Sequence, residues 1–141
     1  MDNGFAESEG MRNLKYLLGI DLGTSGTKTV LFEETGRAVA SETIEYPLYQ
    51  PKNGWAEQEP EDWWNAARDT VKAVIAKSGV KPDDVKGVGI SGQMHGLVLL
   101  DREGRVLRRS ILWCDGRTQE ECDEITQTIG KERLIELSAN P

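Results

Sequence analysis

Residues 19–36 read GIDLGTSGTKTVLFEETG and directly follow the apolar run LKYLL. The residues before the loop predict one strand, and TKTVLFEE predicts a second strand that ends in a Thr-Gly turn. Between them, the loop at 22–26 combines glycines with hydroxyl side chains, and the carboxylate of Asp21 stands just before it. The stretch therefore predicts a β-hairpin whose tip has the composition of a phosphate-binding loop.

The glycine spacing fits neither of the two common nucleotide-binding patterns. A Walker loop needs adjacent glycine and lysine with a helix after them, whereas Gly26 and Lys28 are separated and a strand follows. A dinucleotide fingerprint needs Gly-x-Gly-x-x-Gly at the start of a helix, whereas these glycines fall at positions 19, 23 and 26. Spacing and context therefore exclude both patterns.

The remaining interpretation is a hairpin turn that binds an anion. Backbone N–H groups exposed by Gly23 and Gly26 can form a concave nest, which binds phosphate without a helix dipole. Asp21 can hold Mg²⁺, which prefers carboxylates together with phosphate oxygens, and Lys28 adds a positive charge. Hydroxyl donors are expected from Thr24, Ser25 and Thr27. The alternative is a plain glycine turn with an aspartate that only caps it, and the loop alone leaves both interpretations open.

Beyond the hairpin, the sequence predicts an α/β or α+β layer architecture. A third strand is expected at 38–48, followed by a loop at 47–59. A helix begins at Pro60, carries apolar residues at helical spacing and stops at Gly79. A short buried strand is expected at 86–93, with its glycines marking close approach of the backbone. The order of strands, helix, strands and helices indicates packed layers.

The last third of the chain predicts a hairpin, a strand and a helix. The hairpin is expected at 97–107 and the strand at 110–114. A helix follows from Thr118, whose Thr-x-x-Glu pattern is a capping box. The acidic run at 120–124 is expected to be a solvated helix face. One apolar stripe of this helix is expected to consist of Cys122, Ile125 and Ile129.

Composition excludes several classes of protein. The 141 residues suffice for one domain with a core, and 38% hydrophobic with 29% charged residues is normal for a globular protein. A net charge of −7 argues against a nucleic-acid partner. The sequence shows no membrane span and no signal peptide. The two cysteines lack metal-ligand spacing, so a reduced, cytoplasmic protein is expected.

Four segments carry a resemblance to a known family. They are the hairpin stretch 19–36, NGWAEQEPEDWWNA at 53–66, GISGQMHGLVLLD at 89–101 and ILWCDGRT at 111–118. In this order they resemble the N-terminal part of the FGGY carbohydrate kinases, which are ATP-dependent sugar kinases. The resemblance implies a ribonuclease H-like ATPase domain of the actin/hexokinase/heat-shock-70 type. It covers the chain from about residue 15 to the end.

The resemblance also implies the cofactors ATP and Mg²⁺ and a set of site residues. Asp21 is placed at the metal, as the one residue of the catalytic apparatus in this chain. The ATP phosphates are expected against Gly23, Thr24, Ser25 and Lys28. The sugar is expected against Gln93, Met94, His95, Trp113 and Asp115. The triplet Gln-Met-His at 93–95 is most similar to that of xylulose kinases, whereas glycerol kinases carry Gln-Arg-Glu there and gluconate kinases tend to have Ala-Met-His.

Some of these side chains also have a plain structural interpretation. The single histidine, His95, can be structural or exposed, although we favour a hydrogen bond to a sugar hydroxyl and no role as a general base. Trp113 can be core, and Asp115 and Arg117 can simply pair with one another or begin the helix. Cys114 is expected to be a small buried residue. Packing at the junction of the loop and the helix is expected for Trp55, Trp63 and Trp64.

The family's chains are much longer, and their catalytic aspartate, second phosphate motif and adenosine motif lie beyond residue 141. We therefore expect residues 1–13 to be a disordered leader and 14–141 to be part of the first kinase domain. The expected reaction is phosphorylation of D-xylulose to D-xylulose 5-phosphate by a longer chain that contains this inactive piece. The alternatives are gluconate, L-ribulose or glycerol as substrate, or a non-catalytic module that binds sugar or nucleotide. The resemblance leaves open a homodimer of the full-length protein.

Overall fold

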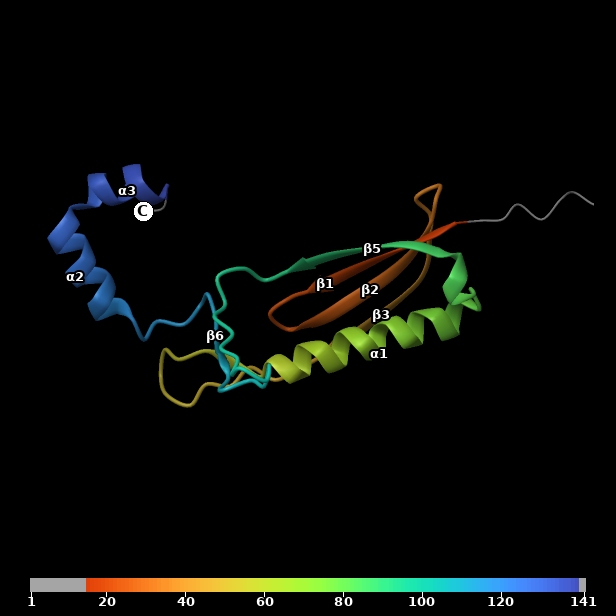
Figure 1. Cartoon of the computed structure of the whole chain (residues 1–141), viewed down its shortest axis with the longest axis horizontal. Helices are drawn as coiled ribbons and strands as arrows, with labels where there is room; N and C mark the ends of the chain where they lie inside the picture. Colours follow the sequence, from red (N-terminus) through yellow and green to blue (C-terminus); the bar gives the residue numbers. More distant parts are fainter. Residues whose placement is uncertain (1–14, 140–141) are drawn as a thin grey trace, which may run out of the picture.

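The structure is a computed structural model that describes residues 15–139 (Figure 1). A four-stranded mixed sheet has the order β3-β2-β1-β5. Strands β1 (Tyr16–Leu22), β2 (Gly26–Glu33) and β3 (Ala38–Glu45) form the antiparallel meander that the sequence predicts. Strand β5 (Val85–Gly92) lies parallel to β1. The expected leader at residues 1–13 lies outside the described residues.

Helix α1 (Pro60–Ser78) covers one face of the meander and creates the core. Alternation along β2 turns Leu31 toward the helix, where it packs with Leu18 and Val74. Both Leu31 and Val74 are fully buried. The same alternation turns Asp21 and Lys28 to the opposite face, which α1 does not cover.

The ends of α1 follow the local signals in the sequence. Pro60 occupies the first turn, followed by the acidic residues Glu61 and Asp62. Gly79 ends the helix in a left-handed conformation (φ 66°), and its N–H donates to Ile75 O at 3.2 Å. The predicted helix is therefore confirmed at both ends.

Strand β5 forms where the sequence predicts it, but it is not buried. The 3-10 turn Pro82–Asp84 leads into it, and β1 is its neighbour in the sheet. Because α1 packs mainly over β2 and β3, only Val85 at the start of β5 packs against the core, and the later apolar side chains of the strand are left open. Ile90 is 73% exposed and Val88 is 58% exposed. The expectation of a buried strand was therefore wrong, because an apolar composition does not by itself mean that another layer covers the strand.

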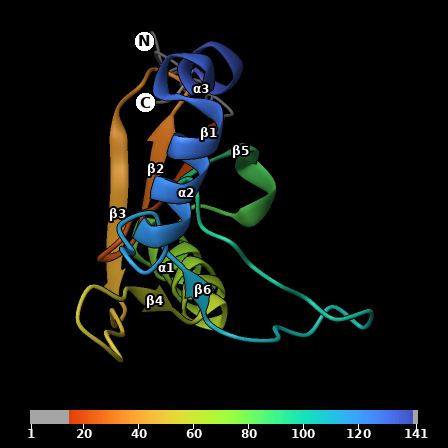
Figure 2. The same ribbon diagram turned by 90° about the vertical axis from the view of Figure 1, so that its left-hand side faces the viewer.

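A second, two-stranded sheet joins β4 (Glu57–Gln58) to β6 (Ser110–Ile111). Figure 2 shows both strands together near the start of α1, while the segment between β5 and β6 extends away from the main sheet. The strand expected at 110–114 ends early, because Asp115 N donates to Leu112 O at 3.0 Å and closes a turn. The hairpin expected at 97–107 is a turn with an isolated bridge between Leu100 and Val106.

Helices α2 (Gln119–Ile129) and α3 (Lys131–Ser138) lie away from the sheet (Figure 1). The acidic run at 120–124 is exposed as predicted, but the apolar stripe of α2 is exposed as well. Thr118 makes no side-chain cap hydrogen bond, since its backbone (φ −102°, ψ 23°) is not in the extended conformation that an N-cap requires. The predicted capping box is therefore wrong. No helix between residues 15 and 139 is both long and apolar enough to cross a membrane.

Candidate functional site

The turn between β1 and β2 is tightly held. Gly23 N donates to Gly26 O at 3.0 Å, and the Tyr46 hydroxyl donates to Gly23 O. A Cβ at Gly26 would lie 2.7 Å from Ile44 O, so only glycine lets β3 approach this closely. The turn is therefore a fixed element whose backbone geometry depends on glycine.

Asp21 and Lys28 face each other on the open side of the sheet. They are register partners on β1 and β2, and Ser91 of β5 is the other neighbour of Asp21. All three line a hollow of about 450 Å³ beside the turn. A single exposed carboxylate next to a positive charge suits a magnesium phosphate, because Mg²⁺ completes its shell with phosphate and water oxygens. Within residues 15–139 no three carboxylate, cysteine or histidine side chains form a metal cluster.

The hydroxyl groups of the turn do not all face the same way. Ser25 is exposed, whereas Thr27 is fully buried on the side of the sheet that α1 covers. The expectation of Thr27 as a donor to an anion was therefore wrong, since alternation along β2 turns it inward. The hydroxyl of Thr24 donates to Gln93 Oε1 at 3.3 Å, which links the turn to the end of β5.

A second hollow, of about 300 Å³, lies at the end of β5. It is lined by Gln93, Met94, His95 and Trp113, which the sequence assigned to the sugar. Gln93 N donates to Leu22 O at 2.8 Å, so this segment begins beside the last residue of β1. Met94 is 72% exposed and Trp113 is 59% exposed, which excludes a core role for Trp113.

His95 adopts a backbone conformation that is uncommon outside glycine. Its φ is 61°, in the left-handed region, where histidine is found more often than most residues. Such conformations carry a free-energy cost and cluster at functional sites. His95 follows the end of β5 at Gly92 and is one of the residues that line the hollow.

Asp115 lies deeper than the hollow and pairs with Arg117. Its carboxylate accepts Arg117 Nε at 2.8 Å and Nη2 at 2.7 Å, and it also accepts Ala56 N at 2.6 Å. The hydrogen bond from Arg117 holds the pKa of Asp115 far below its usual range, against the opposing effect of burial. The predicted pair is therefore confirmed, while contact between Asp115 and a sugar stays a prediction.

The aromatic residues around this pair differ in their environment. The Arg117 guanidinium stacks over Trp55 at 3.6 Å from the ring centre, so Trp55 packs as expected. Trp64 is 65% exposed, because it lies on a part of α1 that the described chain leaves open. Cys114 is exposed as well. The packing predicted for Trp64 and the burial predicted for Cys114 were therefore wrong.

Two polar residues of β4 belong to the site although sequence reasoning gave them no role. Gln58 is fully buried and hydrogen-bonded to both Thr24 and Gln93. Glu57 is also buried and pairs with Arg108 at 2.6 Å and Arg117 at 2.7 Å. The available signal was the polar run at 57–59, which directly precedes the proline that starts α1. Their partners are distant in the sequence, so the pattern did not reveal their burial.

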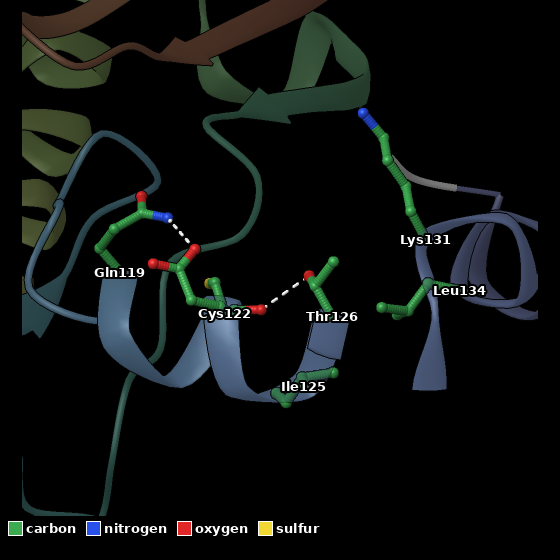
Figure 3. A pocket seen from close by; sticks show the side chains of 7 residues that line it. Gln119, Cys122, Ile125, Thr126, Lys131 and Leu134 are labelled. Carbon is green, nitrogen blue, oxygen red and sulfur yellow. Dashed lines mark hydrogen bonds between the residues drawn. The ribbon is translucent and has the colours of Figure 1, made fainter. Parts of the chain in front are cut away.

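A third hollow, of about 400 Å³, lies between α2 and α3 (Figure 3). Its polar groups largely bond within α2: Gln119 Nε2 donates to Asp123 Oδ1 at 2.9 Å, and Thr126 Oγ1 donates to Cys122 O at 2.7 Å. None of the residues assigned to phosphate or sugar lines it. The candidate site therefore consists of two hollows, one lined by Asp21 and Lys28 and the other by Met94, His95 and Trp113.

Comparison with known proteins finds sugar kinases. The chain is 43% identical over 127 residues to the xylulose kinase of Bacillus subtilis. The matched region covers 90% of this chain and 25% of that protein. Among solved structures, the ligand-bound xylulose kinase and the gluconate kinase of Lactobacillus acidophilus each match with a TM-score of 0.80 and 32% identity. Each match covers 87% of this chain and 24% of the other. The chain thus spans about a quarter of the length of these relatives.

These matches confirm the fold expected from the four sequence segments. The meander, the parallel strand β5 and the covering helix α1 belong to the actin/hexokinase type of ATPase domain. Residues 16–141 match the N-terminal domain of the FGGY family of carbohydrate kinases. The chain therefore belongs to the FGGY family of carbohydrate kinases.

Proposed function

We propose that this chain supplies two parts of an ATP-dependent sugar kinase. One is the turn at 23–26, which would bind phosphate and is called the phosphate turn below, and the other is part of the sugar pocket. The observation that carries the proposal is the hydrogen bond between Thr24 and Gln93. This bond joins the turn at 23–26, which follows Asp21, to the segment at the end of β5 that carries Gln93 and His95. A phosphoryl group can therefore be held on one side of the turn and an acceptor hydroxyl on the other.

The two sides of the turn would have different roles. Bound ATP and Mg²⁺ would supply the transferable phosphoryl group and neutralise its charge. Asp21 would hold the metal, while Lys28 and the turn at Gly23 and Ser25 would bind phosphate oxygens. Thr24 would contribute its backbone, because its hydroxyl hydrogen is directed to Gln93.

On the other side, Met94, His95 and Trp113 would contact the sugar. Met94 and Trp113 offer exposed apolar surface, and His95 offers ring nitrogens that can bond a hydroxyl group. Asp115 would support this surface from behind, because its carboxylate accepts hydrogen bonds from Ala56 N and Arg117 Nη2.

Among sugars, we propose D-xylulose as the acceptor, giving D-xylulose 5-phosphate. The Gln-Met-His triplet and the 43% identity to a xylulose kinase support this choice. The gluconate kinase structure matches this chain equally well in fold, so gluconate is the second candidate. The fold alone therefore does not separate the two sugars.

A coupled assay of ADP release on the intact protein that contains this chain tests the proposal. D-Xylulose, gluconate, L-ribulose and glycerol would be compared at equal concentration, with Asp21→Asn as the inactive control. We expect turnover with D-xylulose that Asp21→Asn abolishes. Preference for another sugar would overturn the substrate, and binding of sugar without turnover would favour a non-catalytic module.

A further inference from the structure

Gln58 of β4 is a fully buried carboxamide that uses all of its hydrogen-bonding capacity. Its Nε2 donates to Thr24 O at 2.6 Å and to Pro47 O at 3.5 Å. Its Oε1 accepts Trp63 Nε1 at 3.0 Å and Gln93 Nε2 at 2.8 Å. One side chain thus contacts the phosphate turn, the sugar-facing strand end and the first turn of α1.

We propose that Gln58 is a positioning residue that fixes the phosphate turn relative to the sugar-facing end of β5. This inference rests on the proposed kinase function. Gln58 lines neither of the two hollows, so it acts through Thr24 and Gln93. Phosphoryl transfer depends mainly on alignment, and a displacement of about 1 Å can lower the rate about a hundredfold.

The direction of every hydrogen bond in this network is set by two indoles. Trp63 Nε1 can only donate, so Gln58 must turn its oxygen toward it and its nitrogen toward Thr24 O. At the other end, Trp113 Nε1 donates to Thr24 Oγ1 at 3.3 Å, which leaves the Thr24 hydroxyl free to donate to Gln93 Oε1. The network therefore has one consistent arrangement of protons.

This arrangement holds Thr24 and Gln93 from two sides each. Thr24 is bonded through its carbonyl to Gln58 and through its hydroxyl to Gln93 and Trp113. Gln93 is bonded through its nitrogen to Gln58 and through its oxygen to Thr24. Buried networks with all members satisfied restrict motion, and losing one member loosens the others.

A different buried pair provides the structural comparison. Thr29 and Thr70 bond at 2.7 Å between β2 and α1, and both are fully buried. Neither residue lines either of the two hollows at the site. Loss of that bond should lower stability without changing the alignment of the two substrates.

The test compares Gln58→Met with Thr70→Val in the intact protein. For Gln58→Met we expect kcat to fall by about tenfold or more, with KM for the sugar changing less, because the sugar contacts remain but their alignment is lost. For Thr70→Val we expect a lower midpoint of thermal unfolding and an unchanged kcat below that midpoint. Thermal unfolding of every variant is measured under the assay conditions.

A second variant, Gln58→Glu, gives a readout that a purely structural role would not produce. A protonated carboxyl group can donate to Thr24 O as the amide does, whereas an ionised carboxylate cannot. We therefore expect kcat relative to the unmodified protein to fall as pH rises from about 5 to about 8, since burial raises the pKa of a carboxyl group above ~4.3. Gln58→Met should show no such pH dependence.

The outcomes separate this inference from the proposed function. An unmodified protein that phosphorylates no sugar would overturn both. An active protein whose Gln58 variants keep kcat, or lose it only in step with thermal stability as Thr70→Val does, would overturn this inference alone. If Gln58→Met does not fold, Trp63→Phe removes one donor to Gln58 and should still lower kcat several-fold, and an unchanged kcat would contradict the proposal.

Discussion

Gly26 begins β2 at the point where β3 comes nearest to the phosphate turn. A Cβ at this position would lie 2.7 Å from Ile44 O and 3.0 Å from Glu45 Cα, and both atoms belong to the backbone. Neither can move aside as the end of a flexible side chain can. The geometry of the turn therefore depends on the absence of one methyl group.

We predict that Gly26→Ala lowers the free energy of unfolding by about 1–3 kcal/mol, because β2 and β3 must separate. Urea unfolding of the protein measures the change. Gly89→Ala is the matched control, since its Cβ would meet Leu18 O at 4.0 Å, an ordinary contact. Equal stability of the two variants would contradict the explanation.

Asp115 provides a prediction on pH at the same scale. Its pKa in the folded protein lies well below the ordinary value of 3.8, chiefly because Arg117 donates to it. The stability from this pair is therefore fully present above about pH 4 and is lost as the pH falls below it. Unfolding measured from about pH 5 down to about pH 2 should show the loss.

Asp115→Asn is the control for this titration. It should be less stable than the unmodified protein at neutral pH, and the difference should shrink as the pH falls. The reason is that the Asp115 carboxylate of the unmodified protein takes up a proton in the unfolded state at a higher pH than in the folded state, which favours unfolding as the pH falls. A constant difference across this range would mean that Asp115 does not carry the pH dependence.

At the scale of elements, α1 and β2 are joined by more than apolar contact. The Thr70 hydroxyl donates to Ala67 O at 3.0 Å, so Thr29 is the donor in the bond between the two threonines. Removal of the Thr70 hydroxyl would leave the Thr29 hydroxyl buried without its acceptor. A buried donor without a partner costs more than the average hydrogen bond contributes.

We predict that Thr70→Val lowers the free energy of unfolding by about 1–3 kcal/mol. The double variant Thr29→Val with Thr70→Val should be less destabilised than the sum of the two single variants, because no orphaned hydroxyl remains. A double-mutant cycle from urea unfolding gives the coupling. Simple additivity would show that the two side chains are independent.

At the scale of the whole molecule, β5 forms an edge of the four-stranded sheet and carries exposed apolar side chains. Ile90 and Val88 of β5 are exposed, and Trp64 of α1 is exposed as well. An exposed apolar strand at a sheet edge promotes association between chains. The net charge of −7 opposes that association.

We predict that the 141-residue chain self-associates as its concentration rises and that Ile90→Lys reduces the association. Sedimentation velocity over a range of concentrations measures it, with binding of a hydrophobic dye as a second readout. Thr43→Lys places the same charge on β3, the other edge strand, and serves as the control. An equal reduction by both variants would attribute the effect to net charge.

Local patterns predicted much of this molecule because their causes are local. Alternation predicted β1, β2 and β3, and Pro60 and Gly79 predicted both ends of α1. The same patterns misjudged β5, since composition cannot say whether another layer covers a strand. They also misjudged Thr118, whose cap depends on backbone angles set by the preceding turn.

The sequence by itself determined the hairpin, the helix and the family, because periodicity, turn residues and ordered motifs are properties of neighbouring positions. Only the tertiary structure decided which residues meet at the site. Thr24 is bonded to Gln93 across 69 positions and to Trp113 across 89 positions. Gln58 joins them because the parallel pairing of β1 with β5 brings distant segments to one end of the sheet, where a buried carboxamide must find partners for all its polar atoms.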